Sequence, residues 1–171
     1  MEKKFLRNLI LIAGLAAIVT SCFNMGSDMD LLEQTKQQEQ LILKNYLDSL
    51  EAYNHDIDTT DLDVYYITIE EGEGDFPTEG DTLVIGYRGT YVNGFLFDSS
   101  EIYYPDGWEF VLGSPPNIPG FDNGVKHVRE GGKIQFIVPS ELAYGTTGHG
   151  NVGPNQTLVF VVKLLELKQS E

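Results

Sequence analysis

One stretch of the chain decides the fold: GDTLVIGYRGTYVNGFLFDSS, residues 80–100. Its first part, Thr82 to Tyr91, is rich in β-branched and aromatic residues, which fit a pleated, half-buried strand. The pair Asn93-Gly94 follows at once, and this dipeptide is a strong signal for a tight β-hairpin turn. The stretch therefore predicts a long strand that turns back on itself.

Strand patterns continue on both sides of this hairpin. Apolar residues alternate with polar ones at period two, the spacing of a strand with one buried face. The last segment, Thr157 to Leu167, is apolar on both faces in its middle, which predicts a central strand. The alternating residues are Tyr65, Ile67 and Ile69, then Trp108, Phe110 and Leu112, and then Ile134, Phe136 and Val138.

A single helix interrupts the strands. After Pro119-Gly120, the residues Phe121, Val125 and Val128 fall at helical spacing, and Glu130-Gly131-Gly132 ends the run. About five strands and one short helix predict an α+β domain, in which an antiparallel sheet curls over the helix.

A second helix is expected upstream, within residues 31–53, which contain neither glycine nor proline. Leu43, Tyr46, Leu47 and Leu50 lie at the spacing of one helix face. The stripe spans only about two turns, which favours packing on the chain's own domain, or a spacer, over a dimerisation or docking helix.

An acidic segment, residues 55–63, separates this helix from the strands. Its aspartates suggest calcium, but a loop counted from Asp56 would need glycine at its sixth position and glutamate at its twelfth. Those positions hold Asp61 and Ile67. The segment is interpreted as a solvated linker.

The N-terminus has the pattern of an export signal. Lys3, Lys4 and Arg7 precede an apolar run from Leu9 to Val19, which is too short to span a bilayer. The run ends just before Cys22, the only cysteine. The segment resembles a bacterial lipoprotein signal, which implies that Cys22 becomes lipidated, with palmitate among its acyl chains. The alternative is a plain cleaved signal with a chance cysteine.

Composition excludes several other classes of protein. Eleven Lys and Arg stand against 26 Asp and Glu, a net charge of −15, which argues against nucleic acid as a partner. One cysteine permits neither an intramolecular disulfide nor a cysteine-based metal cage. The three histidines have no ligand spacing, and neither a phosphate-binding loop nor a serine-hydrolase elbow is present. No metal or cofactor is expected.

The segment from about residue 63 to 171 resembles the FKBP-type peptidyl-prolyl isomerases. The resemblance implies their fold, a strongly twisted antiparallel sheet wrapped around one short helix. It also implies their activity, the cis-trans isomerisation of X-Pro bonds (EC 5.2.1.8), without a cofactor. The matching stretches, in the family's order, are residues 80–100, WEFVLG (108–113), IPGFDNGV (118–125), ELAYG (141–145), GHG (148–150) and PNQTLVFVVKLLEL (154–167).

The resemblance also implies a substrate pocket. Phe121 would form its floor, and Ile118 would add an apolar side and a backbone N–H. Asp98 and Tyr144 would be the catalytic polar groups, with Asp98 tied to Tyr87. The walls would be Tyr87, Phe97, Trp108 and Phe160.

Four departures from the family pattern concern the pocket. Phe121 stands where the family often has tryptophan, and Asn117 where it usually has an apolar residue. Residues 101–105 contain no cation to pair with Asp98. The loop after His149 is shorter and more polar than usual. The pocket entrance, the substrate preference and the binding of macrolide inhibitors therefore follow less directly from the resemblance than the fold does.

The expected organisation is a lipoprotein signal over residues 1–21, a tether with a short helix over 22–62, and an isomerase domain over 63–171. Export and lipidation imply attachment to the membrane of the bacterial cell envelope. Phe23, rather than aspartate, follows Cys22, which resembles an outer-membrane address. The expected function is folding assistance to exported proteins. The alternative is a chaperone or binding module of an envelope complex with weak or no isomerase activity. The oligomeric state is left open.

Overall fold

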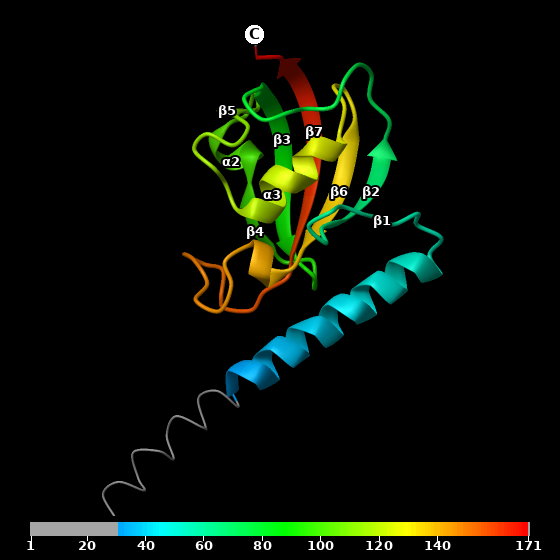
Figure 1. Cartoon of the computed structure of the whole chain (residues 1–171), viewed down its shortest axis with the longest axis vertical. Coiled ribbons are helices and arrows are strands. Elements are labelled where there is room, and N and C mark those ends of the chain that lie inside the picture. Colours follow the sequence, from blue (N-terminus) through cyan, green and yellow to red (C-terminus); the bar gives the residue numbers. More distant parts are fainter. Residues whose placement is uncertain (1–30, 171) are drawn as a thin grey trace, which may run out of the picture. The chain divides into compact units, whose positions relative to one another are not determined.

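The computed structural model describes residues 31–170. The chain divides into two units, Met1–Gln38 and Glu39–Glu171. A helix over residues 31–52, called here the N-terminal helix, contributes its residues from Glu39 onward to the second unit. Figure 1 shows that the rest of the second unit is built around a strongly curved sheet.

The sheet contains seven strands, and every pair is antiparallel. Its order is β1-β2-β6-β7-β3-β4, with β5 paired to the first part of β3. Short β4 and β5 thus share one edge of β3. The strands are β1 (Asp58–Thr59), β2 (Tyr65–Glu70), β3 (Thr82–Tyr91), β4 (Leu96–Ser99), β5 (Trp108–Val111), β6 (Lys133–Val138) and β7 (Leu158–Lys168).

The predicted hairpin is confirmed between β3 and β4. Gly94 has a φ of 86°, a left-handed conformation that glycine adopts without a steric penalty. Its N–H donates to the Tyr91 carbonyl at 2.8 Å, and the Tyr91 N–H donates to the Phe95 carbonyl at 2.9 Å. The turn places Phe97 and Asp98 beside the second half of β3.

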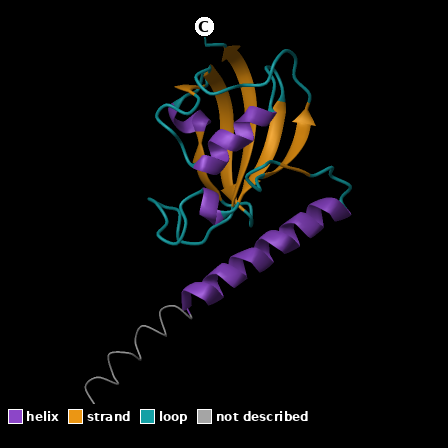
Figure 2. Ribbon diagram, viewed as in Figure 1, coloured by secondary structure: helices purple, strands orange, loops and turns teal. Residues whose placement is uncertain are grey.

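The predicted central strand is also confirmed, because β7 lies between β6 and β3. Leu158, Phe160, Val162 and Leu164 alternate along one face of β7 and are all buried. They contact the core residues of α3 (Pro119–Gly124), the short helix that lies across the concave face of the sheet in Figure 2.

The α-helix of this segment is shorter than its apolar spacing predicts. It ends at Gly124 and continues as a 3₁₀ turn, η1 (Val125–His127), and Val128 is already extended. Phe121, Val125 and Val128 are nevertheless all buried, so the spacing identified the inward side chains correctly. Two other short helical segments are α2 (Ser100–Tyr103) and η2 (Ser140–Leu142).

The α+β fold is as expected, but the sheet has seven strands rather than about five. The acidic segment interpreted as a linker contains β1, which pairs with β2 through Asp58–Tyr66 and Thr59–Tyr65. Thr60 behind it is buried and accepts the Val64 N–H through its hydroxyl at 3.2 Å. A two-residue strand has no period, so the pattern of the sequence could not reveal it.

The N-terminal helix packs on its own domain, as its stripe predicts. Leu43, Tyr46, Leu47 and Leu50 are half-buried, and their neighbours on the other side of the helix are exposed. The Tyr46 hydroxyl bonds to Gln135 of β6, and burial raises the pKa of Tyr46. Within residues 31–170, no helix combines the length and apolar character needed to cross a membrane.

Candidate active site

A cavity of about 320 Å³ opens between α3 and the concave face of the sheet. Six elements or their flanking loops contribute to it: β3, β4, β5, α3, η2 and β7. It is lined by all eight residues that the resemblance places in a pocket, together with Asn117. The lining is Tyr87, Phe97, Asp98, Trp108, Asn117, Ile118, Phe121, Tyr144 and Phe160.

Phe121 forms the floor, and aromatic rings surround it. Its ring centroid lies 5.1 Å from that of Phe160 and 6.0 Å from those of Tyr87 and Trp108. Behind the cavity, Phe110 stacks on Trp108 at 4.4 Å and fixes the plane of the indole. Edge-to-face and offset contacts of this kind favour one defined arrangement of the rings.

Glycine at position 89 creates the space for one wall. A Cβ there would lie 2.6 Å from the Phe97 ring and 3.1 Å from the Phe160 ring. The missing side chain lets Phe97 lie over β3 and meet Phe160 edge to face at 5.7 Å.

The polar residues that follow Phe97 all bind Tyr87. The Tyr87 hydroxyl donates to Asp98 Oδ2 at 2.8 Å, and the Ser99 N–H donates to Asp98 Oδ1 at 2.8 Å. The Tyr87 N–H donates to Ser100 Oγ at 2.9 Å, and Ser99 Oγ donates to the Tyr87 carbonyl at 3.3 Å. Asp98 is thus oriented by a neutral hydroxyl and a backbone amide, where the family often has a cation. The two buried serines hold the backbone of Tyr87 in place.

The phenols at the cavity remain protonated at physiological pH. Burial and the bond to Asp98 raise the pKa of Tyr87 far above its usual value. Burial and the charge of Asp98 also raise the pKa of Tyr144. Both hydroxyls are therefore neutral and can serve as hydrogen-bond donors, and that of Tyr87 donates to Asp98.

Tyr144 follows η2, and its ring stacks on His149 at 5.2 Å. Two residues that matter for the site were not predicted as part of it. Asn117, noted only as a departure, lines the cavity and donates through Nδ2 to Asp122 Oδ1 at 2.8 Å. Glu39, on the N-terminal helix, had no signal in the sequence at all.

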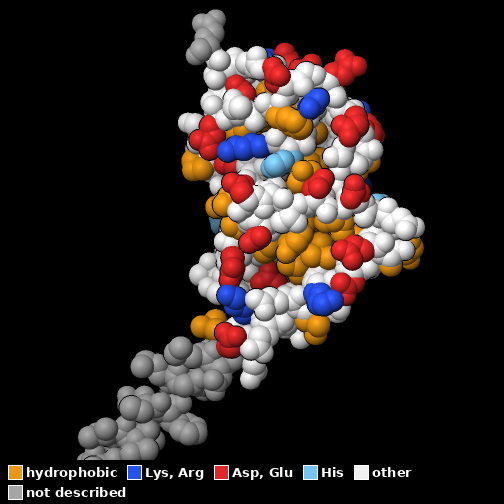
Figure 3. Space-filling view, turned by 45° about the vertical axis from the view of Figure 1, so that its right-hand side comes forward, with side chains coloured by type: hydrophobic (Ala, Val, Ile, Leu, Met, Phe, Trp, Pro, Cys, Tyr) orange, Lys and Arg blue, Asp and Glu red, His pale blue; other side chains and the backbone are white. Residues whose placement is uncertain are grey.

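A larger hollow, of about 760 Å³, lies elsewhere, along the loop of residues 71–75 and Glu130. Its lining contains four carboxylates and no aromatic ring. On the face seen in Figure 3, carboxylates are widely spread, while lysine and arginine occur as isolated groups. This hollow is therefore part of the acidic surface, and the aromatic cavity is the better candidate for chemistry.

Comparison with known proteins agrees with this geometry. Residues 73–165, more than half of the chain, match the family described as FKBP-type peptidyl-prolyl cis-trans isomerase. The chain belongs to this family. All eight predicted pocket residues fall within the matched range. Cys22 lies outside the described residues.

Several relatives bear the family's name. The isomerase FkpA of Escherichia coli K12 is 39% identical over 112 residues, which cover 66% of this chain and 40% of that protein. The isomerase FKBP1A of Xenopus laevis is 40% identical over 103 residues, which cover 59% of this chain and 94% of that protein. In this sequence alignment the chain thus spans less than half the length of FkpA.

Solved structures support the fold. The crystal structure of Escherichia coli FkpA matches with a TM-score of 0.66 and 32% identity, over 81% of this chain and 64% of that one. A Pseudomonas syringae isomerase structure, at 23% identity and a TM-score of 0.62, agrees in fold.

Proposed function

We propose that this protein is a peptidyl-prolyl cis-trans isomerase that acts on X-Pro segments of exported proteins. One observation carries the proposal: a cavity walled by aromatic rings that presents one carboxylate and two neutral phenols. Rotation about a peptide bond meets a barrier of about 18–20 kcal/mol, because the twisted amide loses its resonance. Neither a nucleophile nor a metal is required, only stabilisation of that twisted state.

The rings supply the first part of the mechanism. A proline ring buried between Phe97, Trp108 and Phe121 leaves water, and its amide loses part of the solvation that favours the planar form. Once the C–N bond is twisted, the carbonyl group is no longer conjugated with the nitrogen, and solvation by water stabilises it less. Desolvation therefore lowers the barrier to rotation.

The polar groups supply the second part. The Tyr144 hydroxyl donates to a substrate carbonyl and holds one side of the bond. Asp98, fixed by Tyr87, presents its negative charge to the carbonyl carbon, which becomes more electropositive as resonance is lost. A million-fold acceleration needs about 8 kcal/mol. Each neutral hydrogen bond contributes only about 0.5–1.5 kcal/mol, so desolvation by the rings must supply most of it.

A peptide assay tests this function. The full chain should accelerate isomerisation of an X-Pro peptide in a protease-coupled assay, and should accelerate proline-limited refolding. Asp98→Val and Tyr144→Phe should each lower kcat/KM. A folded protein that gives no acceleration at micromolar concentration would refute the proposal. Competition by a macrolide would show whether such inhibitors enter the same cavity.

A second function is favoured by apolar side chains exposed within residues 95–103, the segment that also carries Phe97 and Asp98 of the cavity. Phe95 is 72% exposed, Tyr103 69% and Ile102 60%. They offer a surface for unfolded client chains, as expected of a chaperone or binding module. Suppression of client aggregation that persists in Asp98→Val and Tyr144→Phe would support this function, while its loss together with isomerisation would argue against it.

We also propose that Cys22 carries a lipid that anchors the domain in the bacterial envelope, at the outer membrane. The pattern of residues 1–22 supports this. Acyl chains contribute about 0.8 kcal/mol per buried CH₂, so several of them hold a protein firmly. Bacteria expressing the chain should incorporate labelled palmitate into it, and Cys22→Ser should abolish both the label and membrane fractionation. Equal fractionation of the two forms would contradict the anchor.

A further inference from the structure

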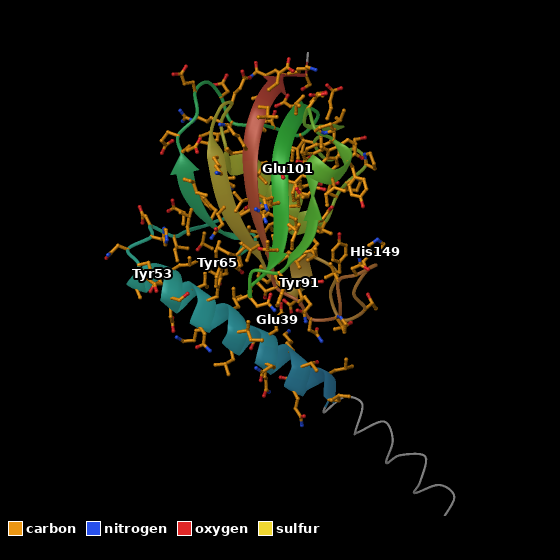
Figure 4. The ribbon with its side chains drawn as sticks, turned by 180° about the vertical axis from the view of Figure 1, so that it is seen from behind. Glu39, Tyr53, Tyr65, Tyr91, Glu101 and His149 are labelled. Carbon is orange, nitrogen blue, oxygen red and sulfur yellow. The ribbon has the colours of Figure 1, made fainter. Side chains whose placement is uncertain are left out.

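Glu39 is a buried carboxylate that comes from outside the segment matched by the family. It lies on the N-terminal helix, is only 8% exposed, and belongs to the same compact unit as the sheet. The family match begins at residue 73. Figure 4 shows Glu39 on the side of the helix that faces the strand ends near Tyr91. A buried carboxylate is costly unless hydrogen bonds replace its water.

Both oxygens of this carboxylate are bound by neutral donors. The Ser140 N–H donates to Oε1 at 2.7 Å, and the Ser140 hydroxyl donates to Oε2 at 2.5 Å. The Thr157 hydroxyl donates to Oε1 at 2.9 Å. Hydrogen bonds to an ionised acceptor are about twice as strong as neutral ones. Glu39 therefore fixes two segments of the domain at once.

Ser140 is the pivot of the turn that carries Tyr144. Its carbonyl accepts the N–H of Ala143 at 2.9 Å and that of Gly145 at 2.8 Å, the residues on either side of Tyr144. Glu39 thus holds the backbone N–H of Ser140, and the Ser140 carbonyl in turn holds the two residues on either side of Tyr144. Thr157 directly precedes β7, which carries Phe160 three residues later.

We propose that Glu39 is a positioning residue for Tyr144, through which the N-terminal helix fixes one polar group of the cavity. The effect on turnover rests on the proposed function of Tyr144, but the effect on the position of its ring does not. A displacement of about 1 Å in a catalytic constellation can cost up to a hundredfold in rate. The ring of Tyr144 remains in place only while the Ser140 turn is held.

The test compares Glu39→Gln with Glu51→Gln in the full chain. Glu51 is an exposed glutamate on the same helix, so its variant controls for the loss of one charge. Glu39→Gln keeps one acceptor oxygen for the two donors that bind Oε1, but it puts an NH₂ group in place of Oε2 opposite the Ser140 hydroxyl and removes the charge that strengthens all three bonds. It should lower kcat/KM about tenfold, while Glu51→Gln leaves it unchanged. In the Tyr144→Phe background the effect of Glu39→Gln should shrink, because the hydroxyl it positions is gone.

Histidine NMR provides a readout that does not depend on activity. His149 stacks on Tyr144, whereas His127 stacks on Tyr66 at 4.7 Å and serves as an internal reference. Glu39→Gln should shift the His149 ring protons and leave those of His127 unchanged. A shift in a protein without isomerase activity would refute the proposed function and keep the positioning role.

Two results would overturn the inference: an unmoved His149 signal, or a kcat/KM loss as large in Tyr144→Phe as in the wild type. If Glu39→Gln does not fold, Ser140→Ala replaces it, because it removes one donor and keeps the N–H bond. The same shift of His149, reduced in size, is then expected, and its absence would overturn the inference.

Discussion

The hydroxyl of Tyr87 holds the carboxylate of Asp98 in the cavity, and Tyr87→Phe removes this single bond. Asp98 would keep only the Ser99 N–H at 2.8 Å, which binds its other oxygen. The carboxylate could then turn toward water. Because the ring remains, the aromatic wall formed with Trp108 and Phe121 should stay intact.

The size of the effect follows from the bond that is lost. A hydrogen bond to a charged group contributes about 1.5–3 kcal/mol, and the half-buried position of this pair favours the lower end. A loss of about 1.4 kcal/mol is a tenfold change. We therefore expect kcat/KM to fall about tenfold, with the free energy of unfolding lowered by about 1.5 kcal/mol.

Tyr91 provides a matched control on the same strand. Its hydroxyl donates to the Asn151 carbonyl at 2.8 Å, and it does not line the cavity. Tyr91→Phe should cost about 0.5–1 kcal/mol of stability and leave kcat/KM unchanged. The assays are protease-coupled peptide isomerisation and urea unfolding. A wild-type kcat/KM in Tyr87→Phe, or an equal loss in Tyr91→Phe, would refute the reasoning.

Three other predictions concern packing and pH. Gly124→Ala would place a Cβ 2.7 Å from the buried Phe136 ring, and this overpacking should lower the free energy of unfolding by about 1–3 kcal/mol. The kcat/KM should be nearly flat from about pH 6 to 8, because the phenols of Tyr87 and Tyr144 have raised pKa values and stay protonated there. Burial lowers the pKa of His127, against the opposing charges of Asp61 and Asp58. His127 therefore takes up a proton at a higher pH in the unfolded chain, below about pH 6.5, than in the folded protein. Acid should for this reason destabilise the wild type more than His127→Phe.

Each of these has a simple measurement and a result that contradicts it. If Gly124→Ala unfolds at the same denaturant concentration as the wild type, the Phe136 ring can move aside without any loss of stability. A limb of the pH profile near neutrality would assign a titrating role to a group such as His149. Equal loss of melting temperature between pH 7.5 and 5.5 in the wild type and His127→Phe would exclude a contribution from His127.

Periodicity and turn chemistry were enough to predict the frame of the domain. The alternation in Thr157–Leu167 predicted the central strand β7, and Asn93-Gly94 predicted the hairpin to β4. Both signals are local, because the direction of a side chain depends on its own backbone. The two-residue β1 is too short to have a period, and the early end of α3 at Gly124 could not be predicted because the apolar spacing continues to Val128.

The pocket residues were identified by resemblance, since composition alone does not separate a pocket aromatic from a core aromatic. Phe121 lines the cavity, whereas Phe136, 5.6 Å behind it, is fully buried. Ser99 and Ser100 lack the elbow of a serine hydrolase, so the sequence assigned them no catalytic role. Their role is to bind the backbone of Tyr87, and this appears only once β4 lies beside β3.

The sequence by itself determined the strand periods, the hairpin, the inward face of α3 and the half-buried stripe of the N-terminal helix. All of these follow from neighbours within a few residues of one another. The tertiary structure alone decided how Tyr87 orients Asp98 and how Glu39 reaches the Ser140 turn across 101 residues of chain. A hydrogen bond needs its partners within about 3 Å, and spacing along the sequence does not record such proximity.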